Sequence, residues 1–199
     1  MSTLHLGFLA SHGGSNMQAI IDACVEGRLD ATPRVAITNN SEAAALERAR
    51  KAGIPRYYIS GKTHPGEMED QAILRTFRAH DVDTVILAGY MKRLGPLTLQ
   101  AYRGRILNIH PALLPKFGGR GMYGKRVHEA VLQAGETVTG VTVHVVDELY
   151  DHGSILAQCE VPVLAGDTVD SLAERVLRQE HRLYPETLRR IAAGELVLD

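Results

Sequence analysis

The chain has 199 residues, of which 45% are hydrophobic and 23% charged, and its 22 Lys and Arg against 23 Asp and Glu leave a net charge of −1. This composition excludes a disordered, collagen-like or disulfide-stapled protein. It provides no excess of positive charge, so neither nucleic acid nor an anionic membrane is the expected partner. The two cysteines, Cys24 and Cys159, have no metal-ligand spacing and are expected to be free thiols, which predicts a cytoplasmic protein without a metal site.

Apolar, β-branched segments alternate with segments of helical periodicity along most of the chain. Strands are predicted at 4–10, 35–38, 57–59, 84–87 and 106–109. Helices are predicted at 17–24, 41–51, 67–80, 96–102 and 125–133, with Ser41 as the cap of the second. This alternation is typical of an α/β protein with a mostly parallel, doubly wound sheet that carries helices on both faces. The first strand is too short to cross a bilayer and lacks the basic leader of a signal peptide.

The C-terminal part departs from this alternation. Two β-rich stretches, 141–146 and 155–163, follow each other closely, and a long helix is predicted over 167–193 with Asp167 as its cap. Pro185 lacks the N–H that a helix interior needs, so a kink is expected there. We therefore expect a single domain over 1–199 in which the last part of the sheet is built differently.

A loop at 11–16 joins the first predicted strand to the first predicted helix. Its adjacent glycines, Gly13 and Gly14, let the backbone approach an anion closely, and the free N–H groups of a helix N-terminus carry partial positive charge. Ser15 and Asn16 could add side-chain donors. The loop matches neither a Walker A nor a GxGxxG pattern. A phosphate site and a tight turn with Ser15 or Asn16 as the helix cap therefore both stay open.

The strongest chemical signal lies at the end of the predicted strand 106–109. Asn108 and His110 are two residues apart, so they project from the same face of an extended strand. The carboxyl ends of parallel strands are where such sheets bind ligands. An amide and an imidazole can both donate to a carbonyl oxygen that becomes a tetrahedral oxyanion. Alternatively, both side chains could only satisfy backbone groups of the loop.

Three acids, Asp147, Glu148 and Asp151, follow the predicted strand 141–146. A carboxylate beside an imidazole orients the ring, raises its pKa and can relay protons. The residue pattern does not distinguish which of the three approaches His110, and each could be a solvated turn residue.

Glu180 interrupts a partly apolar stripe of the long C-terminal helix, between Val176 and Tyr184. A carboxylate on a buried face usually has a partner. A salt bridge with Arg175 or Arg182 is the structural explanation, and a ligand amine or hydroxyl is the functional one.

Residues 108–115, Asn-Ile-His-Pro-Ala-Leu-Leu-Pro, resemble the signature of enzymes that transfer a formyl group from 10-formyltetrahydrofolate. Downstream, 140–153 is similar to the loop that supplies the aspartate of these enzymes. The resemblance implies a catalytic trio of Asn108, His110 and Asp151, and it implies the formyltransferase fold.

Two further segments resemble the branch of this family that formylates glycinamide ribonucleotide in de novo purine biosynthesis. Residues 14–21 are similar to its phosphate loop, and 179–185 to its C-terminal helix, which meets the ribose hydroxyls. The resemblance assigns the acceptor contacts to Gly14, Ser15, Asn16 and Glu180. It implies small-molecule partners, the ribonucleotide and the formyl folate.

Residues 87–94 resemble the folate-pocket segment of the family. The co-substrate 10-formyltetrahydrofolate would then contact Met91, Lys92, Arg93, Leu94, Asn108 and Asp147. The resemblance implies a nucleotide-binding half at about 1–100 and a folate and catalytic half at about 101–199. The segment 116–124 is longer and richer in glycine than the corresponding loop of the family.

The implied reaction is direct acyl transfer without a covalent enzyme intermediate or a metal. The amine attacks the formyl carbon, protonated His110 and the Asn108 amide stabilise the oxyanion, and Asp151 keeps His110 charged while it moves the amine proton. Two alternatives stay open: hydrolysis of the formyl folate, and noncatalytic binding of a phosphorylated metabolite at 13–16.

Overall fold

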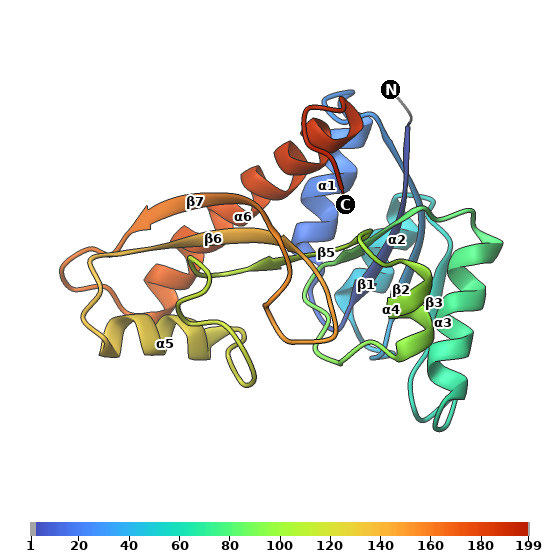
Figure 1. The fold of residues 1–199 in the computed structure, drawn as a ribbon, viewed down its shortest axis with the longest axis horizontal. Coiled ribbons are helices and arrows are strands. Elements are labelled where there is room, and N and C mark those ends of the chain that lie inside the picture. The colour runs from blue at the N-terminus through green and yellow to red at the C-terminus, as the bar shows by residue number, and fades with distance from the viewer. Residues whose placement is uncertain (1–2, 199) are drawn as a thin grey trace.

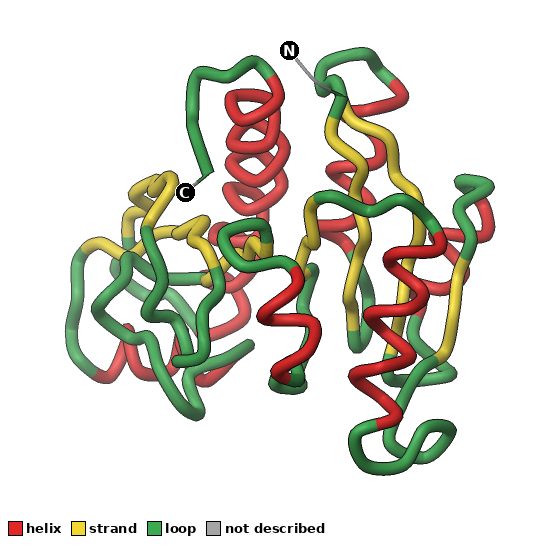
Figure 2. The backbone as a smooth tube through the Cα atoms, turned by 45° about the vertical axis from the view of Figure 1, so that its right-hand side comes forward, coloured by secondary structure: helices red, strands yellow, loops and turns green. Residues whose placement is uncertain are grey.

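One mixed sheet with helices on both faces forms the described part of the chain, residues 3–198, in the computed structural model (Figures 1 and 2). The strands are β1 (Leu4–Ala10), β2 (Ala31–Thr38), β3 (Arg56–Tyr58), β4 (Thr84–Leu87), β5 (Ile106–His110), β6 (Val138–Val145) and β7 (Ile155–Pro162). The helices are α1 (Ser15–Val25), α2 (Ala44–Lys51), α3 (Met68–Ala79), α4 (Pro96–Ala101), α5 (Lys125–Gln133) and α6 (Val169–Ala192). Within residues 3–198, no helix is long and apolar enough to cross a membrane.

The strand order is β3-β2-β1-β4-β5-β6-β7, and the strands up to β5 run parallel. Strands β6 and β7 are antiparallel to their neighbours, so the sheet ends in a hairpin. This arrangement confirms the predicted mostly parallel sheet with a different C-terminal part. The order reverses between β1 and β4, and ligands of open α/β sheets bind at such a reversal.

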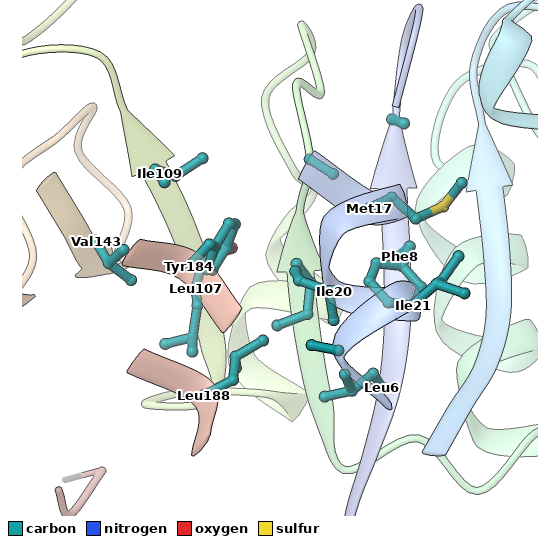
Figure 3. Packing of buried hydrophobic residues seen from close by; sticks show 14 of the residues in the cluster. Leu6, Phe8, Met17, Ile20, Ile21, Leu107, Ile109, Val143, Tyr184 and Leu188 are labelled. Carbon is teal, nitrogen blue, oxygen red and sulfur yellow. The ribbon is translucent and has the colours of Figure 1, made fainter. Parts of the chain in front are cut away.

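The core has one layer on each face of the sheet, because successive strand residues point to opposite sides. On β1, Leu6 and Phe8 pack with α1 and α6, whereas Leu9 packs on the other side, where Phe77 of α3 lies. Figure 3 shows the first layer around Phe8. Tyr184 of α6 is fully buried in this layer, and its hydroxyl donates to the Leu107 carbonyl at 2.8 Å. The hydroxyl therefore ties α6 to β5.

Two predicted helix caps are wrong. The cap of α6 is Thr168, whose side chain accepts the N–H of Ser171 at 3.1 Å. Asp167 instead binds the Arg175 guanidinium with contacts of 2.6 and 2.8 Å, because a two-point charged hydrogen bond is stronger than a cap. Ser41 lies outside α2, which begins at Ala44 without a side-chain cap. Helix α6 continues as one helix through Pro185.

Asp70 of α3 positions the segment that follows β4. Its buried carboxylate accepts the backbone N–H groups of Leu97 at 2.7 Å and Thr98 at 3.1 Å, in the first turn of α4. Gly95 lies so close to the Asp70 side chain that a Cβ there would collide with it. The start of α4 is thereby fixed, and with it the end of the loop that leaves the sheet at Leu87.

Asp70→Ala leaves these N–H groups without an acceptor. We expect the free energy of unfolding to fall by about 1–2 kcal/mol, the usual cost of a lost helix cap. Urea denaturation measures the change, with the exposed Asp30→Asn as a control. An unchanged midpoint would contradict the capping role.

Candidate active site

A cavity of about 500 Å³ lies at the carboxyl ends of β4 and β5 and is called the central cavity here. Its walls come from the ends of both strands, the loop after β4, the segments 119–124 and 146–151, and one residue each of α1, α5, β6 and α6. Most of the predicted site residues line it: Asn16, Met91, Lys92, Arg93, Leu94, Asn108, His110, Asp147, Asp151 and Glu180. Gly14 and Ser15 do not line it.

Asp151 is the acid that reaches His110. Its Oδ2 atom lies 3.6 Å from His110 Nδ1, and its Oδ1 atom lies 3.6 Å from His144 Nε2. Asn108 Nδ2 is 3.1 Å from the same His144 nitrogen. The amide, the carboxylate and two imidazoles therefore form one polar cluster at the end of β5. Asp147 instead contacts His152 at 2.8 Å.

His144 is a member of this cluster that the sequence analysis missed. The antiparallel register places it directly opposite Asn108, with its side chain 2% exposed. Its Nδ1 atom is 2.9 Å from the Val145 carbonyl. A histidine in the predicted strand 141–146 could have been assigned to the site only if the pairing of that strand with 106–109 had been known.

The loop that carries Asp151 is held tightly. The Gly119 N–H donates to Asp151 Oδ2 at 2.9 Å, and Asp151 itself has a positive φ of 54°. Gly153 lies directly against the Val145 carbonyl, where a side chain would collide. This close approach returns the chain to the sheet and directs the Asp151 carboxylate toward β5.

Burial and charge act in opposite directions on the two ionisable partners. Burial lowers the pKa of His110 below its usual value, while the Asp151 charge and the Phe117 carbonyl act to raise it. Burial acts to raise the pKa of Asp151, but the His144 and His110 rings and the Gly119 N–H hold it below its usual value. In the ligand-free protein, burial therefore outweighs the expected effect of Asp151, which was to keep His110 charged.

In another part of the wall of the central cavity, the first turn of α1 meets α6. Asn16 Nδ2 donates to Glu180 Oε2 at 2.6 Å, and both residues are buried. Burial raises the pKa of Glu180, and the Asn16 amide acts to lower it. The salt bridge of Glu180 with Arg175 or Arg182 does not form: Arg175 pairs with Asp167, and the hydrogen-bond partner of Glu180 is Asn16. The alternative of a helix cap at Ser15 or Asn16 does not hold, because Gly14 is the N-cap, with a φ of 67°, and α1 has no side-chain cap.

The predicted folate residues 91–94, in the loop after β4, form a further part of the wall of the central cavity. Lys92 pairs with Glu69 at 2.6 Å, and Arg93 donates to the Glu148 carbonyl at 2.6 Å. Leu94 is buried, whereas Met91 is about half exposed. The sequence analysis missed further lining residues: Tyr90, Arg120, Met122, Tyr123, Arg126, Leu149 and Tyr150.

An amide, an imidazole and a carboxylate around one cavity at the carboxyl ends of parallel strands are the groups that an acyl-transfer enzyme needs to stabilise an oxyanion and move a proton. Residues 5–188 match the family model described as formyl transferase. The chain belongs to the formyl transferase family.

Relatives within this family carry one recurrent name. The chain is 43% identical over 193 residues to "Phosphoribosylglycinamide formyltransferase, chloroplastic" of Vigna unguiculata. The aligned residues cover 96% of this chain and 62% of that protein. It is 39% identical to phosphoribosylglycinamide formyltransferase of Escherichia coli (strain K12), over 97% of this chain and 89% of that protein. The chain thus spans less than two thirds of the length of the plant relative.

A solved structure is also similar. Glycinamide ribonucleotide transformylase 1 from Symbiobacterium toebii superposes with a TM-score of 0.93 at 42% identity, over 99% of this chain and 91% of that chain. The similarity confirms the formyltransferase fold that the resemblance at 108–115 predicts.

Glu180 makes the stability of the protein depend on pH. Its folded-state pKa is raised, so its contribution to stability is fully present below the unfolded pKa of about 4.5. That contribution is lost as the pH rises through the folded-state pKa. Relative to Glu180→Gln, which removes the titration, the wild-type protein should become progressively less stable over this window. Urea denaturation of both proteins at several pH values measures the difference, and a constant difference would contradict the burial of an ionising Glu180.

Proposed function

We propose that the chain transfers a formyl group from 10-formyltetrahydrofolate to the amine of glycinamide ribonucleotide, a step of de novo purine biosynthesis. The observation that carries the proposal is the convergence of Asn108, His110 and Asp151 on one cavity that Asn16 and Glu180 also line. The names of the relatives at 39–43% identity support the choice of acceptor. A cytoplasmic location belongs to the same proposal.

The acceptor would bind along the wall formed by the first loop and α6. Helix α1 begins at Ser15 with neither a side-chain cap nor an acidic residue in its first turn, so its N–H groups favour a phosphate. Gly14 permits the backbone turn that presents them. Glu180, when ionised, can only accept hydrogen bonds, which suits the hydroxyls of a ribose. In this proposal the residues that bind the phosphate belong to the nucleotide-binding half, at about 1–100.

The formyl folate would bind along the loop after β4. Met91 and Leu94 offer apolar surface, while Lys92, Arg93 and Asp147 offer charges for the polar parts of the ligand. The donor would then lie between this loop and 147–151, with its formyl carbon beside Asn108. The residues proposed to act on the formyl group, Asn108, His110 and Asp151, belong to the folate and catalytic half, at about 101–199.

Three residues of the polar cluster, Asn108, His110 and Asp151, have separate roles in the proposed transfer. The amine attacks the formyl carbon, and the Asn108 amide donates to the oxygen as it becomes an oxyanion. His110, whose pKa burial lowers, takes a proton released by the attacking amine. The imidazolium so formed is stabilised by Asp151 and returns the proton to the departing folate nitrogen. Adjacent binding of the two substrates supplies the orientation.

The test of this proposal is a transfer assay with and without the acceptor. Purified protein and 10-formyltetrahydrofolate should yield tetrahydrofolate and formylated ribonucleotide only when glycinamide ribonucleotide is present. Release of formate without the acceptor would support a hydrolase instead. Tight binding of the ribonucleotide without any turnover would support a noncatalytic binder.

His110→Ala and Asp151→Asn should each lower kcat at saturating substrates by at least about a hundredfold, the usual scale of general acid–base losses. Each change removes a group that handles the proton of the amine. His80→Ala and Asp30→Asn, which lie outside the central cavity, are the matched controls. Turnover near the wild-type value in either cavity variant would refute that residue's role.

The pKa of His110 can be measured directly by following its ring resonances during an NMR titration of the ligand-free protein. Because burial lowers this pKa, the midpoint should fall below the usual value of about 6.5. Asp151→Asn removes a charge that raises the pKa, so its midpoint should lie lower still. A higher midpoint in the variant would contradict the electrostatic coupling of the two residues.

A further inference from the structure

The backbone at Phe117–Gly119, called the 117–119 segment here, contacts both partners of the His110–Asp151 pair. The Phe117 carbonyl oxygen is 2.8 Å from His110 Nε2. Two residues later, the Gly119 N–H donates to Asp151 Oδ2 at 2.9 Å. One short stretch of main chain thus supplies an acceptor to the imidazole and a donor to the carboxylate.

Each of the three positions of this segment restricts which residue can occupy it. Phe117 has a φ of 55°, a region that few residues other than glycine, asparagine and aspartate adopt. Gly118 has no room for a Cβ, because Leu114 Cδ2 blocks it and Asp151 Cβ lies 3.3 Å from the same position. Gly119 has a φ of 94°. The sequence Phe-Gly-Gly therefore fits a backbone turn that brings the carbonyl and the N–H to the pair.

The segment is also anchored to the sheet from its N-terminal side. Thr142 of β6 accepts the N–H of Leu114 at 3.0 Å and donates to the Ala112 carbonyl at 2.6 Å. Gln158 of β7 donates to the Leu114 carbonyl at 3.0 Å. These contacts hold the chain between β5 and Phe117 in place, so the carbonyl is presented to His110 by a fixed support.

A carbonyl oxygen can only accept a hydrogen bond. His110 must then carry a proton on Nε2 whenever this contact exists, and the neutral ring has its lone pair on Nδ1. Nδ1 is the nitrogen that lies 3.6 Å from Asp151. The atom that can gain and lose a proton is therefore the one that faces the carboxylate.

We propose that the 117–119 segment is a positioning element that fixes the tautomer of His110, so that Nδ1 is the nitrogen that exchanges the proton with the reacting groups. The assignment of the tautomer rests on the geometry alone, and its consequence for turnover rests on the proposed formyl transfer. The charged or titratable groups facing the ring are Asp151 from the loop after β6, His144 of β6 and His128 of α5. None of these three side chains is within hydrogen-bond distance of His110 Nε2. The partner of that nitrogen is the Phe117 carbonyl.

Two substitutions at one position separate the backbone from the aromatic ring. Phe117→Asn removes the ring but tolerates a positive φ, whereas Phe117→Ile removes the ring and disfavours that φ. Both variants lose the same packing of Phe117 against the core. Only the isoleucine variant should lose the carbonyl contact, so the asparagine variant is the matched control.

The ring nitrogen shifts of His110, measured by NMR in the ligand-free protein, report the tautomer without any assay of activity. We expect the Nε2–H form in the wild type and in Phe117→Asn, and a mixture of forms in Phe117→Ile. The titration midpoint of His110 should be lower in Phe117→Ile than in Phe117→Asn, because the Phe117 carbonyl acts to raise the pKa.

In the transfer assay, kcat of Phe117→Ile should lie at least about tenfold below that of Phe117→Asn, with KM values similar to each other, because a misplaced proton acceptor affects the chemical step. An Nδ1–H ring in the wild type overturns the proposal, as do equal tautomers and equal kcat in the two variants. If Phe117→Ile does not fold, the wild-type measurement alone decides. Absence of transfer in the wild type together with the Nε2–H form would refute the proposed function and leave the tautomer assignment standing.

Discussion

The contact between Asp151 and His110 is the constraint on which the candidate site depends. His110 is the last residue of β5 and Asp151 lies in the loop between β6 and β7, yet their side chains are 3.6 Å apart. The antiparallel pairing of β6 with β5 therefore brings His144 to Asn108, and the loop after β6 brings Asp151 to both imidazoles.

Much of the fold could be predicted from the sequence, because its signals are local. The runs at 4–10, 84–87 and 106–109 are apolar and β-branched, and the structure contains strands at all three. The predicted cap at Ser41 is wrong because α2 begins only at Ala44. The predicted cap at Asp167 is wrong because a residue further along α6 binds its carboxylate. Arg175, one and a half turns into α6, takes the carboxylate of Asp167.

The candidate site was predictable only in part. Asn108 and His110 follow from their spacing in one strand, whereas the choice of Asp151 among three acids came from the family resemblance. The Asn16–Glu180 hydrogen bond joins positions 164 residues apart, and no periodicity in either segment indicates it. His144 enters the site through strand register, which a single sequence does not specify. Long-range pairing is thus what separates the predicted residues from the missed ones.

The hydrogen bond between Asn16 and Glu180 has a consequence for the order in which the protein is made. Asn16 at the start of α1 is synthesised 164 residues before its partner Glu180 on α6. A nascent chain that has completed β5 already contains Asn108 and His110, yet this wall of the cavity is missing. The part of the cavity wall that contains Asn16 and Glu180 therefore cannot form before α6 has been synthesised, and a translation product truncated before α6 lacks it.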